Sequence, residues 1–348
     1  MKKKNLYIVL ILSALVSIFL FKSISLPAKS TGNLPKESNK LLHFVQLSDT
    51  HINYSNAKDT NRLLGSSQQL LQKAVEQVNA IPNLDFVLFS GDFIDFTDKE
   101  LLQKFINITN EIKYPVYVLL GNHEMYVGPG NQDSLKKENL IKVFYNPGLK
   151  QLFQHPFKTR KSFHNKKTYY SFLPNTKFKI ICLDLAIQEH TSNGQIPDEE
   201  LEWLKHEISQ DQDKYIIIAS HFPLIEPYPS KSHYVLSPGR EKLLQVIESS
   251  PNVIGYFSGH YHAARLFKIN GKIHNSNPAL IEYPNAFREI SITKNPNDNK
   301  NINVEFKFHT VNLPDLVTLS KKALGKKAEL NSGKETDRDQ IIQFSTKN

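Results

Sequence analysis

The chain has 348 residues, 40% of them apolar, which is enough for one large domain or two ordinary ones with a substantial core. Its only cysteine, Cys182, lies in an apolar run, which excludes a disulfide framework within the chain and predicts a buried, inert thiol. The net charge of +9 is unevenly distributed: residues 38–312 carry 30 basic and 28 acidic groups. This nearly neutral body argues against a general nucleic-acid surface, although residues 136–179, with eleven basic groups and one acid, form a local basic segment able to steer an anion.

The N-terminus has the pattern of an export signal. Three lysines at 2–4 precede an uncharged, largely apolar stretch over residues 5–21, which Lys22 closes. This pattern predicts a signal peptide or membrane anchor in residues 1–25, followed by a Pro-, Ser- and Lys-containing linker over 26–40. Basic residues ahead of the apolar run favour an exported body, either secreted or held at the membrane through residues 5–21. The length of the run does not decide between these two outcomes.

The rest of the chain alternates between strand and helix patterns. Short β-rich runs and amphipathic helices are expected in chain order. They are strand 43–48, helix 63–80, strand 86–90, helix 99–112, strand 116–120, a hairpin over 169–183, helix 198–208, strand 215–220, helix 240–248, strand 253–258 and β segments at 266–273 and 287–292. This alternation predicts an α/β fold for a domain over residues 41–312. The polar residues 313–348 are expected to form a poorly ordered C-terminal tail.

Five of the apolar runs end in the same way, with a small residue followed by a side chain that can bind a metal ion. These pairs are Ser48 before Asp49 and His51, Gly91 before Asp92, Gly121 before Asn122, Ser220 before His221, and Gly259 before His260 and His262. Ligands bind in open α/β sheets at the crevice outside the carboxyl ends of the strands. The repeated pattern therefore predicts that these side chains converge on one site, where small neighbouring residues let the backbones crowd together.

Two aspartates, one asparagine and four histidines make a mixed oxygen and imidazole set without a thiolate. Such a set disfavours calcium and a structural zinc site, and suits Mn, Fe, Zn or Co. The seven side chains can serve two divalent ions if one carboxylate bridges them. Two carboxylates would then leave a net charge of about +2, enough to stabilise a hydroxide and an anionic phosphate together.

The motifs Asp-x-His, Gly-Asp-x-x-Asp, Gly-Asn-His-Glu, a histidine closing a strand and Gly-His-x-His occur in this order between residues 43 and about 310. Together they resemble the calcineurin-like metallophosphoesterases. The resemblance implies a four-layer αββα sandwich with a dimetal centre at the sheet edges. The purple acid phosphatases of this family are a poorer match, because they carry tyrosine where this chain has Asp95.

The resemblance also implies a role for each motif residue. Asp49, His51 and His262 would bind one metal ion. Asn122, His221 and His260 would bind the other, with Asp92 bridging the two. His123 would face the substrate, so that His123 and Asp92 are the candidate catalytic residues.

Other polar residues are expected to be structural. Asp95, Asp184 and Glu124 are expected to orient ligands or stabilise the fold rather than to react. Histidines outside the motifs are expected to be ordinary side chains: His43, His155, His164, His190, His206, His233, His274 and His309.

The predicted function is metal-dependent hydrolysis of phosphate esters. A hydroxide that bridges the two metal ions would attack phosphorus, and His123 would protonate the leaving group or stabilise its charge. The substrate would be a phosphorylated small molecule or polymer, with monoesters, diesters and nucleic acid all left open. The alternative is an exported polyanion-binding or interaction module on the same fold with little catalysis. Missing ligands would indicate that alternative, and none is missing.

Overall fold

The computed structural model describes residues 39–345 except 127–167, 187–190, 231 and 297. The predicted signal or anchor, most of the linker and the basic segment up to residue 167 lie outside these described residues. Among the described helices, none is both long enough and apolar enough to cross a bilayer. Residues 39–345 belong to one compact unit.

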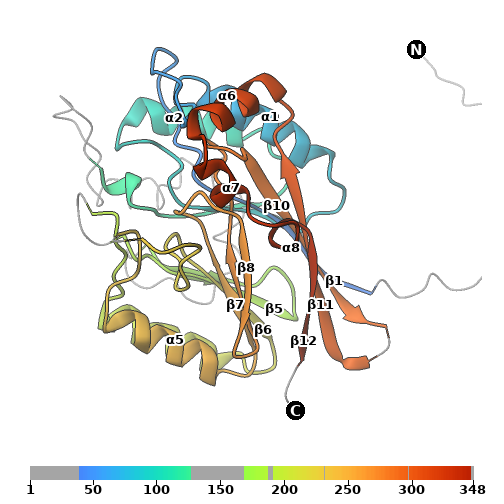
Figure 1. Ribbon diagram of the computed structural model, residues 1–348. Helices are drawn as coiled ribbons and strands as arrows, with labels where there is room; N and C mark the ends of the chain where they lie inside the picture. Colours follow the sequence, from blue (N-terminus) through green and yellow to red (C-terminus); the bar gives the residue numbers. More distant parts are fainter. Residues whose placement is uncertain (1–38, 127–167, 187–190, 231, 297, 346–348) are drawn as a thin grey trace, which may run out of the picture. The chain divides into compact units, whose positions relative to one another are not determined.

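The first of two six-stranded sheets has the order β12-β11-β10-β1-β2-β3. β1, β2 and β3 run parallel. β10, β11 and β12 add antiparallel strands at the other edge, beside β1 (Figure 1). The bounds are β1 Lys40–Leu47, β2 Phe86–Ser90, β3 Val116–Leu119, β10 Ala286–Asn295, β11 Asp298–Thr310 and β12 Gln340–Ser345. The parallel strands are the ones expected to present Asp49, Asp92 and Asn122.

The second sheet has the order β4-β5-β6-β7-β9-β8. Its central strands are parallel, and the antiparallel β4 and β8 close its edges. The bounds are β4 Tyr170–Phe172, β5 Phe178–Cys182, β6 Tyr215–Ala219, β7 Val253–Ser258, β8 Arg265–Ile269 and β9 Lys272–Ser276. The hairpin predicted over 169–183 is confirmed. The predicted β segment 266–273 is part of a second hairpin, which turns at Asn270 and Gly271.

Helices cover the outer face of each sheet. α1 (Ser67–Ala80) and α2 (Lys99–Thr109) contribute to the same apolar cluster as the first sheet, and α4 (Asp198–Gln210) and α5 (Gly239–Ser249) to a cluster with the second. α2 begins where Asp98 accepts hydrogen bonds from the N–H groups of Glu100 and Leu101. α1 begins later than residue 63: Leu63 lies in the loop before it, where it forms an isolated β-bridge with Asp59 and donates its N–H to Ile281 O.

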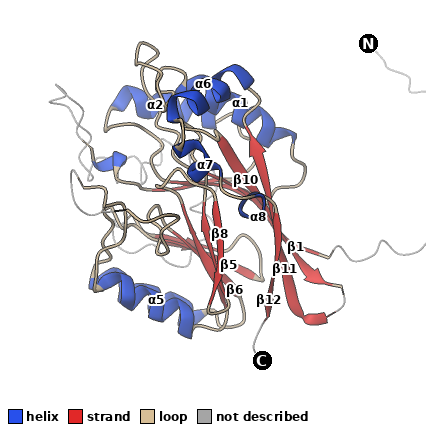
Figure 2. Cartoon of the chain, in the orientation of Figure 1, coloured by secondary structure: helices blue, strands red, loops and turns tan. Residues whose placement is uncertain are grey.

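The alternation of side chains along the strands produces a layered core. On β1, Phe44 faces the second sheet, whereas Val45 and Leu47 pack under the helices. Phe44 stacks on Phe86 with ring centroids 4.7 Å apart, and a third apolar cluster joins residues of both sheets between them. The resulting order of helices, sheet, sheet and helices (Figure 2) agrees with the predicted four-layer α/β sandwich.

The expectation of a poorly ordered tail over residues 313–348 is wrong. The chain continues as α6 (Pro314–Leu324), α7 (Lys327–Ser332), α8 (Glu335–Arg338) and the edge strand β12. β12 pairs antiparallel with β11 and buries Ile342 and Phe344, while Ile341 on the other face is 61% exposed. Each of these elements buries only one narrow face, so its average composition is polar. Its few apolar positions are therefore hard to recognise in the sequence.

Candidate metal centre

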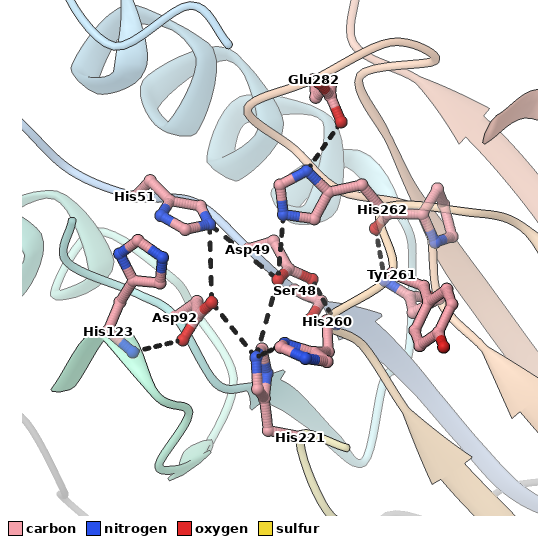
Figure 3. A network of polar contacts seen from close by, with 12 residues as sticks. Ser48, Asp49, His51, Asp92, His123, His221, His260, Tyr261, His262 and Glu282 are labelled. Carbon is pink, nitrogen blue, oxygen red and sulfur yellow. Dashed lines mark hydrogen bonds and ion pairs between the residues drawn. The ribbon is translucent and has the colours of Figure 1, made fainter. Parts of the chain in front are cut away.

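The carboxyl ends of strands from both sheets meet at one site (Figure 3). Asp49 and Asp92 follow β1 and β2 in the first sheet, and His221 and His260 follow β6 and β7 in the second. The backbone N–H of His260 donates to Asp49 Oδ2 at 3.1 Å and so connects the loops of the two sheets. The predicted convergence of strand ends is therefore present.

The backbone at this site is strained. Asp49, His51, Asp92, His260 and His262 all have positive φ, between 41° and 73°. This left-handed region is unfavourable for residues with a Cβ and is concentrated at functional sites. The small residues that precede the predicted ligands are required for steric reasons. A Cβ at Gly91 would lie 2.5 Å from His221 Nδ1, and one at Gly121 would overlap the Asp92 carboxylate.

The aspartate oxygens lie among the inward-facing imidazole nitrogens. Asp92 Oδ2 lies 3.1 Å from His221 Nε2 and 3.6 Å from His51 Nε2. Asp49 Oδ1 lies 3.4 Å from His262 Nε2 and 4.0 Å from His51 Nε2. Asp92 thus faces one histidine from each of the two predicted ligand groups, as a bridging carboxylate would.

The donor atoms fall into two clusters. Asp49, His51 and His262 form one, and Asp92, His221 and His260 form the other, with the atoms of each cluster all within 4.8 Å of one another. This division agrees with the two ligand groups implied by the family resemblance. Asn122 is also buried, and its Oδ1 lacks a hydrogen-bond partner among the described residues.

Two of the four imidazoles are oriented by backbone carbonyls. His221 Nδ1–H donates to Ser90 O at 2.8 Å, and His260 Nε2–H donates to Ser192 O at 2.8 Å. The opposite ring nitrogens, His221 Nε2 and His260 Nδ1, lie 3.0 Å apart and face the centre. Two unprotonated nitrogens so placed would share a metal ion, since an imidazole binds a metal through the nitrogen opposite its outer hydrogen bond.

The other two imidazoles are oriented by carboxylates. His51 Nδ1–H donates to Asp95 Oδ1 at 3.1 Å, and His262 Nδ1–H donates to Glu282 Oε2 at 2.9 Å. The inward His51 Nε2 is buried and has no hydrogen-bond partner among the described residues, and the same holds for Asp49 Oδ1. Leaving buried polar atoms unpaired is costly. These atoms therefore fit a pair of divalent ions that would complete their coordination.

The metal-free electrostatics show how strongly the charges at this site depend on each other. Burial opposes the charge of Asp49, but the neighbouring His262 and His221 hold its pKa well below the usual range. Burial likewise opposes protonation of His221, yet the charge and hydrogen bond of Asp92 raise its pKa to about 9. His51, buried and close to the charge of His123, has its pKa lowered to about 4. Divalent ions would take the place of the protons on these imidazoles.

Glu124 joins the ends of β2 and β3. Its fully buried carboxylate accepts hydrogen bonds from the backbone N–H groups of Gly121, Asp92, Phe93 and Ile94. Burial and the charge of Asp92 together raise its pKa to about 7. Glu124 holds the backbone of the predicted ligands in place, in agreement with the orienting role predicted for it.

His123 lies at the edge of the centre, where its side chain is 17% exposed. Its backbone N–H donates to Asp92 Oδ1 at 2.9 Å, and its Nδ1–H donates to Asp95 O at 2.6 Å. Burial opposes its charge, but Asp92 and Asp95 raise the pKa of His123 above its ordinary value. Asp95 therefore orients both His51 and His123, as expected of a residue that positions ligands.

Sequence reasoning missed two residues of this site. Glu282 was not selected: the apolar run Ala279–Ile281 ends at it, but no small residue precedes it as in the five motifs. His233 was treated as an ordinary side chain, but its ring centroid lies 5.0 Å from that of His260. No sequence signal identifies His233, because it lies in a polar loop and only the fold brings it to the site.

Comparisons with known proteins agree with this geometry. Residues 42–264 match the family model of calcineurin-like phosphoesterases. A probable glycerophosphodiester phosphodiesterase of Arcobacter nitrofigilis is 25% identical over 220 residues, which cover 63% of this chain and 71% of that protein. A manganese-dependent ADP-ribose/CDP-alcohol diphosphatase of Arabidopsis thaliana is 23% identical over 287 residues, covering 67% and 85%.

A solved structure shares the fold. A dimetal phosphatase from Danio rerio superposes with a TM-score of 0.60 at 17% identity, over 78% of this chain and 96% of that one. The motifs, the paired clusters of ligands, the family match and this fold all agree. The chain belongs to the calcineurin-like phosphoesterase family, and it is a dimetal-dependent hydrolase of phosphate esters.

Proposed function

We propose that this protein cleaves phosphorus–oxygen bonds at a phosphate that carries two substituents, in a small phosphorylated molecule. The observation that carries the proposal is the arrangement of four imidazoles, each with an outer hydrogen-bond acceptor. The inner nitrogens of His51, His221 and His262 face Asp49 or Asp92, and that of His260 faces His221 Nε2. The named relatives support the choice of a diester or diphosphate, because they include a probable glycerophosphodiester phosphodiesterase, an ADP-ribose/CDP-alcohol diphosphatase and a cyclic AMP phosphodiesterase of Vibrio vulnificus.

The chain's own residues would position the reacting groups. When bound, two divalent ions would supply an acidified water and offset the charge of the phosphate. Asp92 would help to hold both ions, and the backbone N–H of His123 fixes its carboxylate. The His123 ring, held through Nδ1 by Asp95 O, would turn Nε2 toward the leaving oxygen and give it a proton.

Two chromogenic substrates test the proposal. Manganese-reconstituted protein should hydrolyse bis(p-nitrophenyl) phosphate with a higher kcat/KM than p-nitrophenyl phosphate. Elemental analysis of the same sample should find close to two transition-metal ions per chain. A higher kcat/KM for the monoester would contradict the diester assignment, and metal content well below one per chain with full activity would contradict the roles given to the two clusters.

We also propose that the body acts outside the cytoplasm, on the basis of the apolar run over residues 5–21 behind three lysines. The strands of both sheets lie within residues 40–345. Protein lacking residues 1–38 should therefore be soluble and active. A fusion of residues 1–38 to a reporter that works only after export should be active, whereas an inactive reporter would contradict the proposal.

A further inference from the structure

A cavity of about 210 Å³ lies beside the metal centre. Two of the predicted metal ligands, His260 and His262, form part of its wall, so the cavity and the metal centre share these two side chains. The volume equals that of about seven water molecules in the liquid, which is more than a phosphate group occupies. The remaining wall includes Arg62, Lys327 and His233.

The wall of this cavity carries two cationic side chains, Arg62 and Lys327, against one carboxylate, Glu282, so its net charge is positive. Among the described residues, neither the Arg62 guanidinium nor the Lys327 ammonium has an ion pair. The pKa of His233 is lowered, mainly by burial and also by nearby positive charges that include Arg62 and Lys327. Both cations therefore lie near the His233 ring. Glu282 accepts hydrogen bonds from His262, Asn61 and Asn331, and the charge of Lys327 is one of the causes that lower its pKa. Its single negative charge offsets one of the two cations and leaves the other.

The two cations are attached to backbone that is held in place. Arg62 forms an isolated β-bridge with Glu282, and Asn61 O accepts a hydrogen bond from Ser320 Oγ at 2.6 Å. Lys327 begins α7, which is fixed at its other end by Ala264 N–H donating to Asn331 O at 2.8 Å. The residues that line the cavity come from five separate parts of the chain, and two of them, Glu282 and Lys327, lie beyond residues 42–264, which match the family model.

We infer that this cavity, which we call the anion pocket, binds a second phosphate group of the substrate, separate from the phosphate that is cleaved. Arg62 can donate two parallel hydrogen bonds to phosphate oxygens, and Lys327 adds a second positive charge. The inference rests on the proposed function, and it defines the substrate as a phosphodiester or diphosphate that carries a further phosphate on one of its two substituents.

The test uses pairs of substrates that differ only in that second phosphate. One pair is thymidine 5′-(p-nitrophenyl phosphate) with and without a 3′-phosphate. The other is glycerol 3-(p-nitrophenyl phosphate) with and without a 1-phosphate, which changes the distance between the two groups. All four release p-nitrophenolate, so the bond that breaks is the same. The full-length, manganese-reconstituted protein should show a kcat/KM about ten-fold higher for the phosphorylated member of at least one pair, mainly through a lower KM.

Two variants locate the effect. Arg62→Gln and Lys327→Gln should each reduce the preference for the phosphorylated member several-fold while metal content stays at the wild-type level. Lys326→Gln is the matched control, because Lys326 is an exposed neighbour of Lys327 that does not line the cavity. It should keep the full preference.

The outcomes separate this inference from the proposed function. If none of the four substrates is hydrolysed, the proposed function fails. If all are hydrolysed but neither pair shows a preference, the anion pocket fails and the proposed function stands. If Arg62→Gln slows both members of a pair equally, Arg62 acts on the cleaved phosphate, and the inference is overturned.

Discussion

Glu282 Oε2 accepts a hydrogen bond from His262 Nδ1 at 2.9 Å, while His262 Nε2 lies 3.4 Å from Asp49 Oδ1 (Figure 3). The same carboxylate accepts from the side chains of Asn61 and Asn331. Glu282 therefore connects one predicted metal ligand to the loop after β1 and to α7. It keeps the His262 proton on Nδ1, which leaves Nε2 free to bind a metal ion.

Replacing Glu282 should weaken metal binding without removing a ligand. In Glu282→Gln the neutral amide is a poorer acceptor for the imidazole N–H, so the affinity of one of the two sites should fall about 10–100-fold. Competition with a chelator during manganese titration measures this. The control is Glu76→Gln, a change at an exposed position of α1 that should leave both affinities unchanged. Wild-type affinity in Glu282→Gln would show that the hydrogen bond does not support the site.

Asn122 and His123 are neighbours with different predicted roles. Asn122→Ala should lower metal content, because its buried Oδ1 is a predicted ligand atom. His123→Ala should keep both metal ions and lower kcat by about 10²–10⁴-fold, if the ring acts as a general acid. The loss should be smaller for diesters with weakly basic leaving groups, which need little protonation. Equal losses for all leaving groups would instead make His123 a stabiliser of charge, and metal loss in His123→Ala would make it a ligand.

The edge strand β12 should contribute to the stability of the sheet. Phe344 is 3% exposed and lies in the cluster between the sheets, so Phe344→Ala should lower the free energy of unfolding by about 3–5 kcal/mol. Ile341 is in the same strand but 61% exposed, and Ile341→Ala should change stability by less than about 0.5 kcal/mol. Chemical denaturation measures both variants. Similar values for the two would indicate that β12 does not pack as described.

Glu289 on β10 should make stability depend on pH. Its carboxylate accepts hydrogen bonds from His309 and His43, both at 2.8 Å, on the two neighbouring strands. These contacts hold the pKa of Glu289 well below its usual value. A carboxyl group with a lowered pKa in the folded state stabilises the protein above its unfolded pKa of about 4.3, and that contribution is lost as the pH falls toward the folded value.

The comparison with Glu289→Gln should isolate this contribution. At pH 6–7 the variant should be less stable than the wild type by about 2 kcal/mol, because a hydrogen bond to a charged group is lost. As the pH falls below about 4.3, the difference should shrink, because Glu289 takes up a proton in the unfolded wild-type chain while it stays charged in the folded one, and this favours the unfolded state. Denaturation midpoints at a series of pH values measure it. A difference that stays constant down to pH 3 would contradict the role of the charge.

The sequence by itself determined the parts of this protein that depend on local pattern. Strand ends such as Ser48–Asp49 and Gly259–His260 could be found because apolar runs of β-forming residues stop abruptly at a small residue and a polar one. The parallel strands, the hairpin over 169–183 and the helices of both outer layers follow from periodicity for the same reason. The grouping of the seven predicted ligands at one site followed from the rule that ligands bind at the carboxyl ends of strands.

Only the tertiary structure decided what comes from residues far apart in the chain. His233 and Glu282 are separated from the motifs they adjoin, and the C-terminal residues 314–345 are too polar on average to indicate a fold. Their positions depend on packing between distant elements, as when Ile342 and Phe344 enter a core formed by both sheets. The anion pocket depends in the same way on Arg62 and Lys327, which are 265 positions apart and become neighbours only because α7 is fixed beside Glu282. The local sequence pattern does not reveal such a contact, because the contact contributes free energy only when both of its segments are folded.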